Sequence, residues 1–232
     1  MNQLVRSEYS KAGYVFAASA ESIAKKYGFD KIARLASNEN PYPPSDKVLK
    51  AAADALGCAN RYPDPSAADF KNALRRYICD APVVTSGLGM DGVIETVIRT
   101  LVNPGDKVVI STPTFSMYGI AARAAFANVV NVARDSNFDV DVDKFIAEAK
   151  HAKLSFLCTP NNPTGSVTSV EDIEKILEHI RGVLFLDCAY CEFSDVDYTP
   201  LLSHDNLIIG RTLSKVYGLA GLRVGYAFVP KW

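Results

Sequence analysis

Short apolar runs alternate with amphipathic stretches along most of the chain, and the spacing of the apolar positions changes between them. Continuous apolar runs bounded by turn residues predict buried strands, whereas apolar positions that recur every three to four residues predict helices. The predicted strands are residues 83–85, 107–111, 129–132, 154–158, 183–186, 207–209 and 226–229. The predicted helices are residues 20–27, 45–56, 69–78, 93–101, 118–125, 141–149 and 170–180.

This order of elements predicts an α/β fold, with a mostly parallel sheet that carries helices on both faces. Residues 41–232 are expected to form this large domain. Residues 1–40 are expected to form an N-terminal arm or part of a small domain, with one amphipathic helix before the irregular segment 38–44 (NENPYPP). Open parallel sheets bind ligands in the loops that follow the carboxyl ends of their strands, so functional residues are expected there.

Composition narrows the classes of protein to consider. Apolar residues make up 48% of the 232 residues, and the net charge of −1 provides no basic surface for a nucleic acid. No apolar run approaches the roughly 18–20 residues that a membrane span needs. Residues 1–8 lack the apolar centre of a secretory signal, so we expect a cytoplasmic protein without membrane or nucleic-acid partners.

The five cysteines are an odd number, which together with the absence of a secretory signal predicts free thiols. Cys188 and Cys191 form a C-x-x-C pair, but the neighbouring Asp187 is expected to raise the thiol pKa. A zinc site would need further ligands, and the sequence has no second such pair of cysteines or histidines. We therefore expect neither redox chemistry nor a bound metal.

Residues 87–92 (GLGMDG) fit the pattern G-x-G-x-x-G between a predicted strand and a predicted helix. The N–H groups at such a helix start can hold a phosphate. A nicotinamide dinucleotide would also need an acidic residue at the end of the next strand, where residues 110–113 (ISTP) provide none. A nicotinamide-dependent dehydrogenase is therefore a distant alternative to a more general phosphate site.

Three charged residues follow predicted strands near the end of the chain: Asp187, Lys215 and Arg223. A lysine, an aspartate and an arginine at strand ends suit an anionic aromatic cofactor with a basic ring nitrogen. Each residue alone is more often an ordinary surface or helix-capping group, and only their combination indicates a site.

Four segments resemble the fold-type I aminotransferases that depend on pyridoxal 5'-phosphate: residues 161–165 (NNPTG), 187–190 (DCAY), 214–215 (SK) and 221–225 (GLRVG). Three further segments resemble the histidinol-phosphate aminotransferases within that family: residues 35–41 (LASNENP), 60–65 (NRYPDP) and 112–118 (TPTFSMY). The resemblance implies the cofactor-binding large domain of that fold. It also implies amino transfer between L-histidinol phosphate and 2-oxoglutarate in histidine biosynthesis.

The same resemblance implies roles for the residues around the cofactor ring. Lys215 matches the lysine that joins the cofactor as a Schiff base and shuttles a proton. Asp187 matches the partner of the pyridine nitrogen. Asn162 and Tyr190 match residues that bond the ring's phenolic oxygen, and Phe115 matches the aromatic residue that stacks on the ring.

The cofactor's phosphate is assigned by resemblance to the backbone of Gly89, Met90 and Asp91 and to the side chains of Thr212, Ser214 and Arg223. Tyr62 matches a tyrosine that reaches the phosphate from the other subunit of a homodimer. If the match holds, each active site is built from two copies of the chain.

The chain also departs from the family pattern. Gly92 and Cys188 each stand where glutamate is usual, and Val216 stands where a small residue is commoner. The family continues beyond residue 232 with a second domain that carries a substrate-binding arginine, so the large domain is expected to be incomplete here. A decarboxylase similar to the threonine-phosphate decarboxylases and a non-catalytic cofactor-binding fragment remain alternatives.

Overall fold

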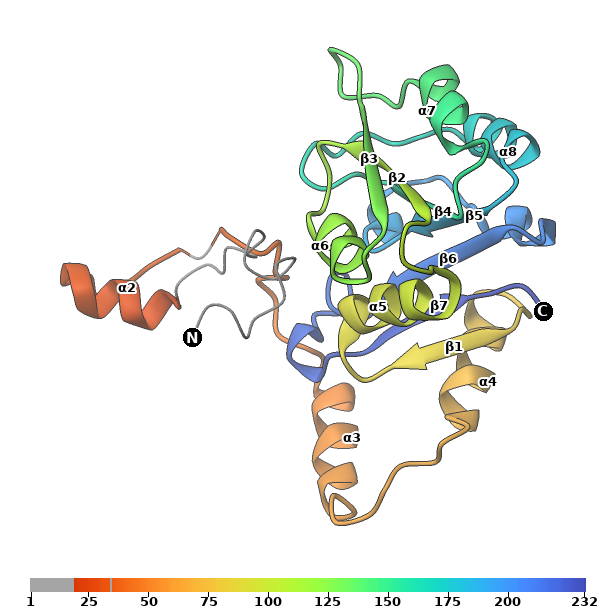
Figure 1. Cartoon of the computed structure of the whole chain (residues 1–232). Coiled ribbons are helices and arrows are strands. Elements are labelled where there is room, and N and C mark those ends of the chain that lie inside the picture. Colours follow the sequence, from red (N-terminus) through yellow and green to blue (C-terminus); the bar gives the residue numbers. More distant parts are fainter. Residues whose placement is uncertain (1–18, 34) are drawn as a thin grey trace, which may run out of the picture.

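A computed structural model describes residues 19–33 and 35–232, and its centre is one seven-stranded sheet (Figure 1). The strands are β1 (Val83–Ser86), β2 (Lys107–Thr112), β3 (Asn128–Ala133), β4 (Leu154–Cys158), β5 (Val183–Asp187), β6 (Leu207–Thr212) and β7 (Gly225–Phe228). Their order is β1-β7-β6-β5-β4-β2-β3, and only β7 is antiparallel to its neighbours. The predicted mostly parallel sheet is therefore confirmed.

Seven α-helices are described: α2 (Ala20–Tyr27), α3 (Asp46–Leu56), α4 (Ala68–Tyr77), α5 (Gly89–Leu101), α6 (Met117–Ala124), α7 (Val142–Ala149) and α8 (Val170–His179). Short 3-10 helices, which the sequence pattern did not predict, are η2 (Cys191–Phe193), η3 (Thr199–Ser203) and η4 (Ala220–Leu222). Ser45 caps α3, because its hydroxyl accepts a hydrogen bond from the Val48 N–H. Helix α5 begins one turn earlier than predicted, so the glycine segment forms its first turn.

Both faces of the sheet are covered, and alternate side chains of a strand belong to different apolar clusters. In β5, Leu184 and Leu186 pack into the cluster that includes residues of α4, α7 and α8, whereas Phe185 packs with residues of α5 and α6. Burying one such side chain contributes roughly 1.5–3 kcal/mol. Burial on both faces explains why the strands appear in the sequence as continuous apolar runs.

The parallel strands end side by side at one edge of the sheet. Asp187, the last residue of β5, pairs in register with Cys158 at the end of β4 and with Gly210 near the end of β6. Side chains that follow these strands are therefore brought together although they are far apart in sequence.

Of the predicted arm, residues 1–40, the structure describes residues 19–33 and 35–40, and its assignment as an arm or part of a small domain stays a prediction. Helix α2 stands away from the sheet, and the chain then returns toward the strand ends before α3 begins (Figure 1). No helix in the described part of the chain has the length and apolarity to cross a membrane.

Candidate active site

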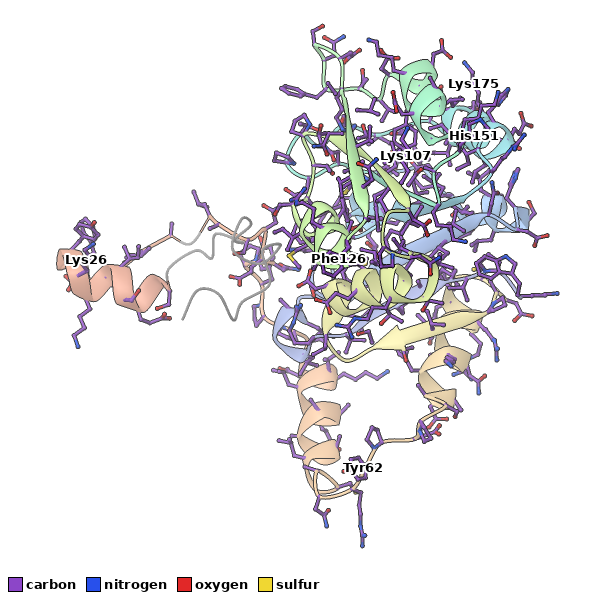
Figure 2. All side chains as sticks on the ribbon, in the orientation of Figure 1. Lys26, Tyr62, Lys107, Phe126, His151 and Lys175 are labelled. Carbon is purple, nitrogen blue, oxygen red and sulfur yellow. The ribbon has the colours of Figure 1, made fainter. Side chains whose placement is uncertain are left out.

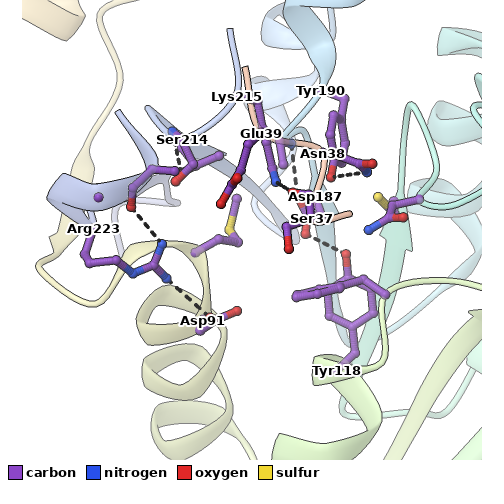
Figure 3. Close-up of a pocket in the computed structure, with 18 residues that line it drawn as sticks. Ser37, Asn38, Glu39, Asp91, Tyr118, Asp187, Tyr190, Ser214, Lys215 and Arg223 are labelled. Atoms are coloured by element: carbon purple, nitrogen blue, oxygen red, sulfur yellow. Dashed lines mark hydrogen bonds and ion pairs between the residues drawn. The ribbon is translucent and has the colours of Figure 1, made fainter. Parts of the chain in front are cut away.

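A cavity of about 530 Å³ opens at the carboxyl ends of β4, β5 and β6 (Figure 3). It is lined by ten residues that the sequence predicted as site residues: Met90, Asp91, Phe115, Asn162, Asp187, Tyr190, Thr212, Ser214, Lys215 and Arg223. Gly89 lies against Arg223 at its edge. The fold thus brings together residues that are spread along the sequence from Met90 to Arg223.

Asp187 lies on the floor of the cavity with only 2% of its surface exposed. The Tyr118 hydroxyl donates to its Oδ2 at 2.5 Å, and the Ala189 N–H donates to its Oδ1 at 3.0 Å. Burial raises the pKa of Asp187 to about 6, and these two hydrogen bonds oppose the rise. A carboxyl group of this kind is a suitable partner for a cation that enters the cavity.

Lys215 follows β6 and projects toward the arm. Its Nζ donates to the Ser37 carbonyl oxygen at 2.8 Å and lies 5.5 Å from the centre of the Tyr190 ring. The Tyr190 hydroxyl accepts a hydrogen bond from Asn38 Nδ2 at 3.1 Å. The arm therefore contacts the two residues that the sequence placed at the reacting end of a cofactor.

Burial is the main cause that lowers the pKa of Lys215. The carboxylates of Glu39 and Asp187 oppose this effect, and the positive charge of Arg223 adds to it. Like-charge repulsion from Arg223 thus acts in the same direction as burial, but burial is the larger cause. A lysine that must attack a carbonyl group needs its neutral form, which a lowered pKa favours.

The positive charge at the other end of the cavity is that of Arg223, which is paired with Asp91 at 3.4 Å. Gly89, the first residue of α5, has a φ of +69°, and a Cβ built there would lie 2.6 Å from Arg223 Nη2. The Gly89 N–H donates to the Arg223 carbonyl oxygen at 2.8 Å and so connects the start of α5 to the Arg223 loop, while the phosphate contact that resemblance assigned to Gly89 stays a prediction. The next N–H groups, of Met90 and Asp91, belong to a helix start and have no carbonyl partner within the helix.

Thr212 and Ser214 form a buried pair at this positive end. Thr212 Oγ1 lies 2.9 Å from Ser214 Oγ and accepts the Ser214 N–H at 3.1 Å. It also lies 3.2 Å from the Val224 carbonyl oxygen. Thr212 therefore ties the turn after β6 to the strand that follows Arg223 and fixes the position of the Ser214 hydroxyl.

The structure adds residues that the sequence analysis missed. Tyr118 is fully buried and bonds Asp187, although its segment was noted only for its resemblance. Ser37, Asn38 and Glu39 of the arm also line the cavity. Their segment was noted too, but nothing in its pattern indicated that it would lie over the carboxyl ends of the strands.

Tyr62 is the one predicted site residue that lies far from the cavity. It is fully exposed in the loop that follows α3, at the end of the molecule opposite to α7 and α8 (Figure 2). Its predicted action in the site of a second copy stays a prediction.

The C-x-x-C pair lies beside the floor of the site. Burial, followed by the neighbouring Cys191 thiol, raises the pKa of the Cys188 thiol well above its usual range, and Asp187 adds to the rise. The expected direction is therefore right, with burial as its main cause. Within residues 19–33 and 35–232, no cluster of three histidine, cysteine or acidic side chains could hold a metal ion.

Comparison with known proteins identifies the class to which this fold and site belong. Residues 30–232 match the sequence model of the family described as "Aminotransferase class I and II". The chain therefore belongs to the class I and II aminotransferases, and the dehydrogenase alternative is excluded.

Particular relatives narrow this class. The chain is 74% identical over its whole length to the histidinol-phosphate aminotransferase of Methanocorpusculum labreanum and 58% identical to that of Methanoculleus marisnigri. It spans 66% of the length of each, slightly less than two thirds.

A solved structure confirms the predicted fold type. The histidinol-phosphate aminotransferase from Sinorhizobium meliloti, in complex with pyridoxal-5'-phosphate, superposes with a TM-score of 0.86 at 29% identity. The match covers 97% of this chain and 63% of that one.

Proposed function

We propose that this protein binds pyridoxal 5'-phosphate and transfers an amino group between L-histidinol phosphate and 2-oxoglutarate. The observation that carries the proposal is the polarity of the cavity, which has a buried carboxyl group at its floor and a cationic end at α5, with Lys215 among its lining residues. The choice of amino donor is supported by the 74% identical relative that is named a histidinol-phosphate aminotransferase.

The residues present fit this cofactor. Pyridoxal 5'-phosphate carries a phosphate, a basic ring nitrogen and an aldehyde. The start of α5, the Ser214 hydroxyl and the Arg223 guanidinium form an anion site for the phosphate. Asp187 offers a carboxylate to the ring nitrogen, and Lys215 offers an amine to the aldehyde.

When bound, the cofactor supplies an electron sink for the carbon that loses its proton. The Asp187 carboxylate keeps a proton on the ring nitrogen, because a negative partner stabilises the cationic form. The Lys215 amine would act as general base toward the proton on the substrate carbon and then as general acid. Asn162 and Tyr190 would hold the phenolic oxygen, and Phe115 would supply an apolar wall against the ring.

We also propose a homodimer, in which Tyr62 contributes to the phosphate site of the neighbouring copy. Tyr62 lies in an exposed loop and does not line the cavity of its own chain. An exposed aromatic side chain on a loop is a suitable contact across a two-fold axis.

The direct test is an assay of the 2-oxoglutarate-dependent conversion of L-histidinol phosphate to its oxo form, with formation of glutamate and with pyridoxal 5'-phosphate added. In a chain extended by the second domain of the family, which the resemblance implies to carry the substrate-binding arginine, we expect turnover by the wild type, loss of turnover in Lys215→Ala, and near wild-type turnover in Lys175→Ala. Lys175 is the matched control because it is a surface lysine paired with Asp143 far from the cavity (Figure 2). Cofactor binding without amino transfer, or release of carbon dioxide from a phosphorylated amino acid, would contradict the proposed reaction.

A further inference from the structure

Tyr118 is a buried polar residue to which the proposed chemistry gives no part. It is the second residue of α6 and none of its surface is exposed. Its hydroxyl points at the Asp187 carboxylate and lies 2.5 Å from Oδ2 (Figure 3). The hydroxyl is the donor, because an ionised carboxylate can only accept.

Two hydrogen bonds hold the Asp187 carboxylate. One is the Tyr118 bond to Oδ2, and the other is the Ala189 N–H bond to Oδ1. A carboxylate has about four acceptor positions, so others remain for a donor that enters the cavity that Asp187 lines. The Ala189 bond comes from the same turn as Asp187 itself, so Tyr118 provides the link to a different element.

The Tyr118 ring is itself fixed by aromatic neighbours. It stacks on Phe156 of β4, with ring centres 4.9 Å apart and planes 10° from parallel. It also meets Phe115 edge-on at 5.7 Å and 82°. Both arrangements are favoured for aromatic pairs. Tyr118 therefore contacts two other residues that line the cavity, the carboxylate of Asp187 and the ring of Phe115.

The charged and titratable groups around Asp187 come from four elements. They are Tyr118 of α6, Asp91 of α5, Cys158 of β4 and Lys215 after β6, and the Cys188 thiol next to Asp187 in the chain is a fifth group. Burial raises the pKa of Tyr118 well above its usual value, with the charge of Asp187 adding to it, so the phenol keeps its proton. For Asp187, the Tyr118 hydroxyl is the largest influence that lowers the pKa, ahead of the Ala189 N–H and Lys215, whereas Asp91 raises it.

We propose that Tyr118 is a positioning residue, which orients the Asp187 carboxylate and keeps it ionised for the ring nitrogen of the cofactor. This inference rests on the proposed function for the identity of the cofactor. Its core, the control of Asp187 by Tyr118, concerns only residues of this chain. The two parts can therefore be tested separately.

The fold offers a matched control. Tyr198 is a buried tyrosine whose hydroxyl donates to the Thr168 carbonyl oxygen, and it belongs to the apolar cluster on the opposite face of the sheet. Replacing Tyr198 by Phe removes a buried hydroxyl and its hydrogen bonds with Thr168 and Thr159, neither of which involves the Asp187 carboxylate. A loss of stability is expected in both Tyr198→Phe and Tyr118→Phe. An effect on the Asp187 carboxylate is expected only in Tyr118→Phe.

The first measurement is the titration of Asp187 in the cofactor-free protein, followed by NMR of carboxyl carbons and assigned with Asp187→Asn. We expect Tyr118→Phe to move the Asp187 titration upward by about one pH unit, because a hydrogen bond to the charged form is lost. Replacing Tyr118 by 3-fluorotyrosine, a stronger donor of almost the same shape, is expected to move it downward. The 3-fluorotyrosine variant also tests the role of Tyr118 if Tyr118→Phe does not fold. Tyr198→Phe is expected to leave the titration in place.

The second measurement is the affinity for pyridoxal 5'-phosphate as a function of pH. The midpoint at which binding weakens on acidification is expected to move with the Asp187 titration in each Tyr118 variant and to stay fixed in Tyr198→Phe. An Asp187 titration that shifts equally in Tyr118→Phe and Tyr198→Phe, or does not respond to the fluorinated residue, overturns the role of Tyr118. Failure of the wild type to bind the cofactor at any pH overturns the proposed function instead, while the NMR titration still decides whether Tyr118 controls Asp187.

Discussion

Lys215 and Asp187 are both shifted by burial toward their neutral forms, but the chemistry needs a neutral group from only one of them. Burial lowers the pKa of Lys215 and so prepares its amine for attack on a carbonyl group. Burial raises the pKa of Asp187 to about 6, although the proposed role needs a charged carboxylate. Asp187 thus depends on a cationic partner and on its hydrogen bonds to stay ionised.

The lowered pKa of Lys215 predicts that the cofactor attaches to this residue. After incubation with pyridoxal 5'-phosphate and reduction by borohydride, peptide mass spectrometry is expected to find the cofactor chiefly on Lys215. A lowered pKa leaves more of this amine neutral near pH 7, whereas an exposed lysine near about 10.4 is almost fully protonated. Preferential labelling of another lysine, such as Lys107 or Lys175, would contradict the site assignment.

The state of Asp187 predicts how the cofactor-free protein responds to pH. The folded pKa of about 6 lies above the usual value of 3.8, so the folded state binds a proton that the unfolded state has released between these values. The contribution of Asp187 to stability is therefore greatest at low pH and is lost as the pH rises from about 4 to about 6.

Asp187→Asn removes this titration. The variant is expected to be more stable than the wild type near pH 8 by up to about 3 kcal/mol, with a smaller change in stability between pH 4 and 6. Its turnover is expected to fall at least about 100-fold, because the ring nitrogen loses its charged partner. Urea unfolding of both proteins at pH 4, 6 and 8 measures the change in stability, and a rate assay measures the change in turnover. A stability difference that does not depend on pH would mean that Asp187 is not the titrating group.

Residues of the site could be predicted from sequence where they follow a strand end or begin a helix. Asp187, Lys215 and Met90 are of this kind, since the sheet carries them all to one edge. Tyr118 could not be identified in this way, because a tyrosine on a helix is directed by packing against Phe156 and not by its own spacing. Ser37 was missed because the path of an arm depends on contacts with residues far along the chain.

At the level of elements, the start of α5 controls the cationic end of the site. Gly89 has a positive φ and leaves room for the Arg223 guanidinium, which contacts the Leu88 carbonyl oxygen and Asp91. A side chain at residue 89 would both strain the backbone and displace this guanidinium.

Gly89→Ala is expected to weaken the binding of pyridoxal 5'-phosphate by about 10-fold or more, since a charge-assisted contact to the phosphate is disturbed. Gly105→Ala is the matched control: Gly105 also has a positive φ, +87°, but no atom lies within 4 Å of the built Cβ. Each backbone strain costs about 1–2 kcal/mol of stability. Cofactor titration by absorbance should separate the two. Equal losses of affinity would show that strain alone is responsible.

Most elements were predicted to within a few residues, because burial on both sheet faces gives clear apolar runs. The reversed direction of β7 was not predicted. A parallel connection needs a crossover, usually a helix, and the segment between β6 and β7 contains only the three-residue η4. The 3-10 helices were missed because they are too short to show a period.

At the level of the whole molecule, the proposed sharing of sites between two copies makes a prediction about mixtures. Tyr62→Ala and Lys215→Ala are each expected to be impaired alone. In a hybrid dimer the Lys215 of one chain meets the Tyr62 of the other, so one site is intact. Activity measured after dissociating, mixing and reassociating the two variants is therefore expected to exceed both parents.

The control for this mixture is Tyr77→Ala, which removes another exposed tyrosine and should leave activity close to that of the wild type. A mixture whose activity equals the mean of its parents would mean that Tyr62 acts within its own chain or not at all.

The position of β7 in the sheet determines when the site can form during synthesis of the chain. A Cβ built on Gly225 would lie 2.3 Å from the Gly89 carbonyl, and β7 pairs with β1 as well as with β6. Helix α5 can form early from local contacts, but Arg223 reaches Gly89 only after a long loop has closed. Residues up to the end of β7 must therefore have left the ribosome before the proposed anion site can form. Until then the partly synthesised domain contains Asp187, but it lacks the Arg223 contact with Gly89 that the phosphate site needs.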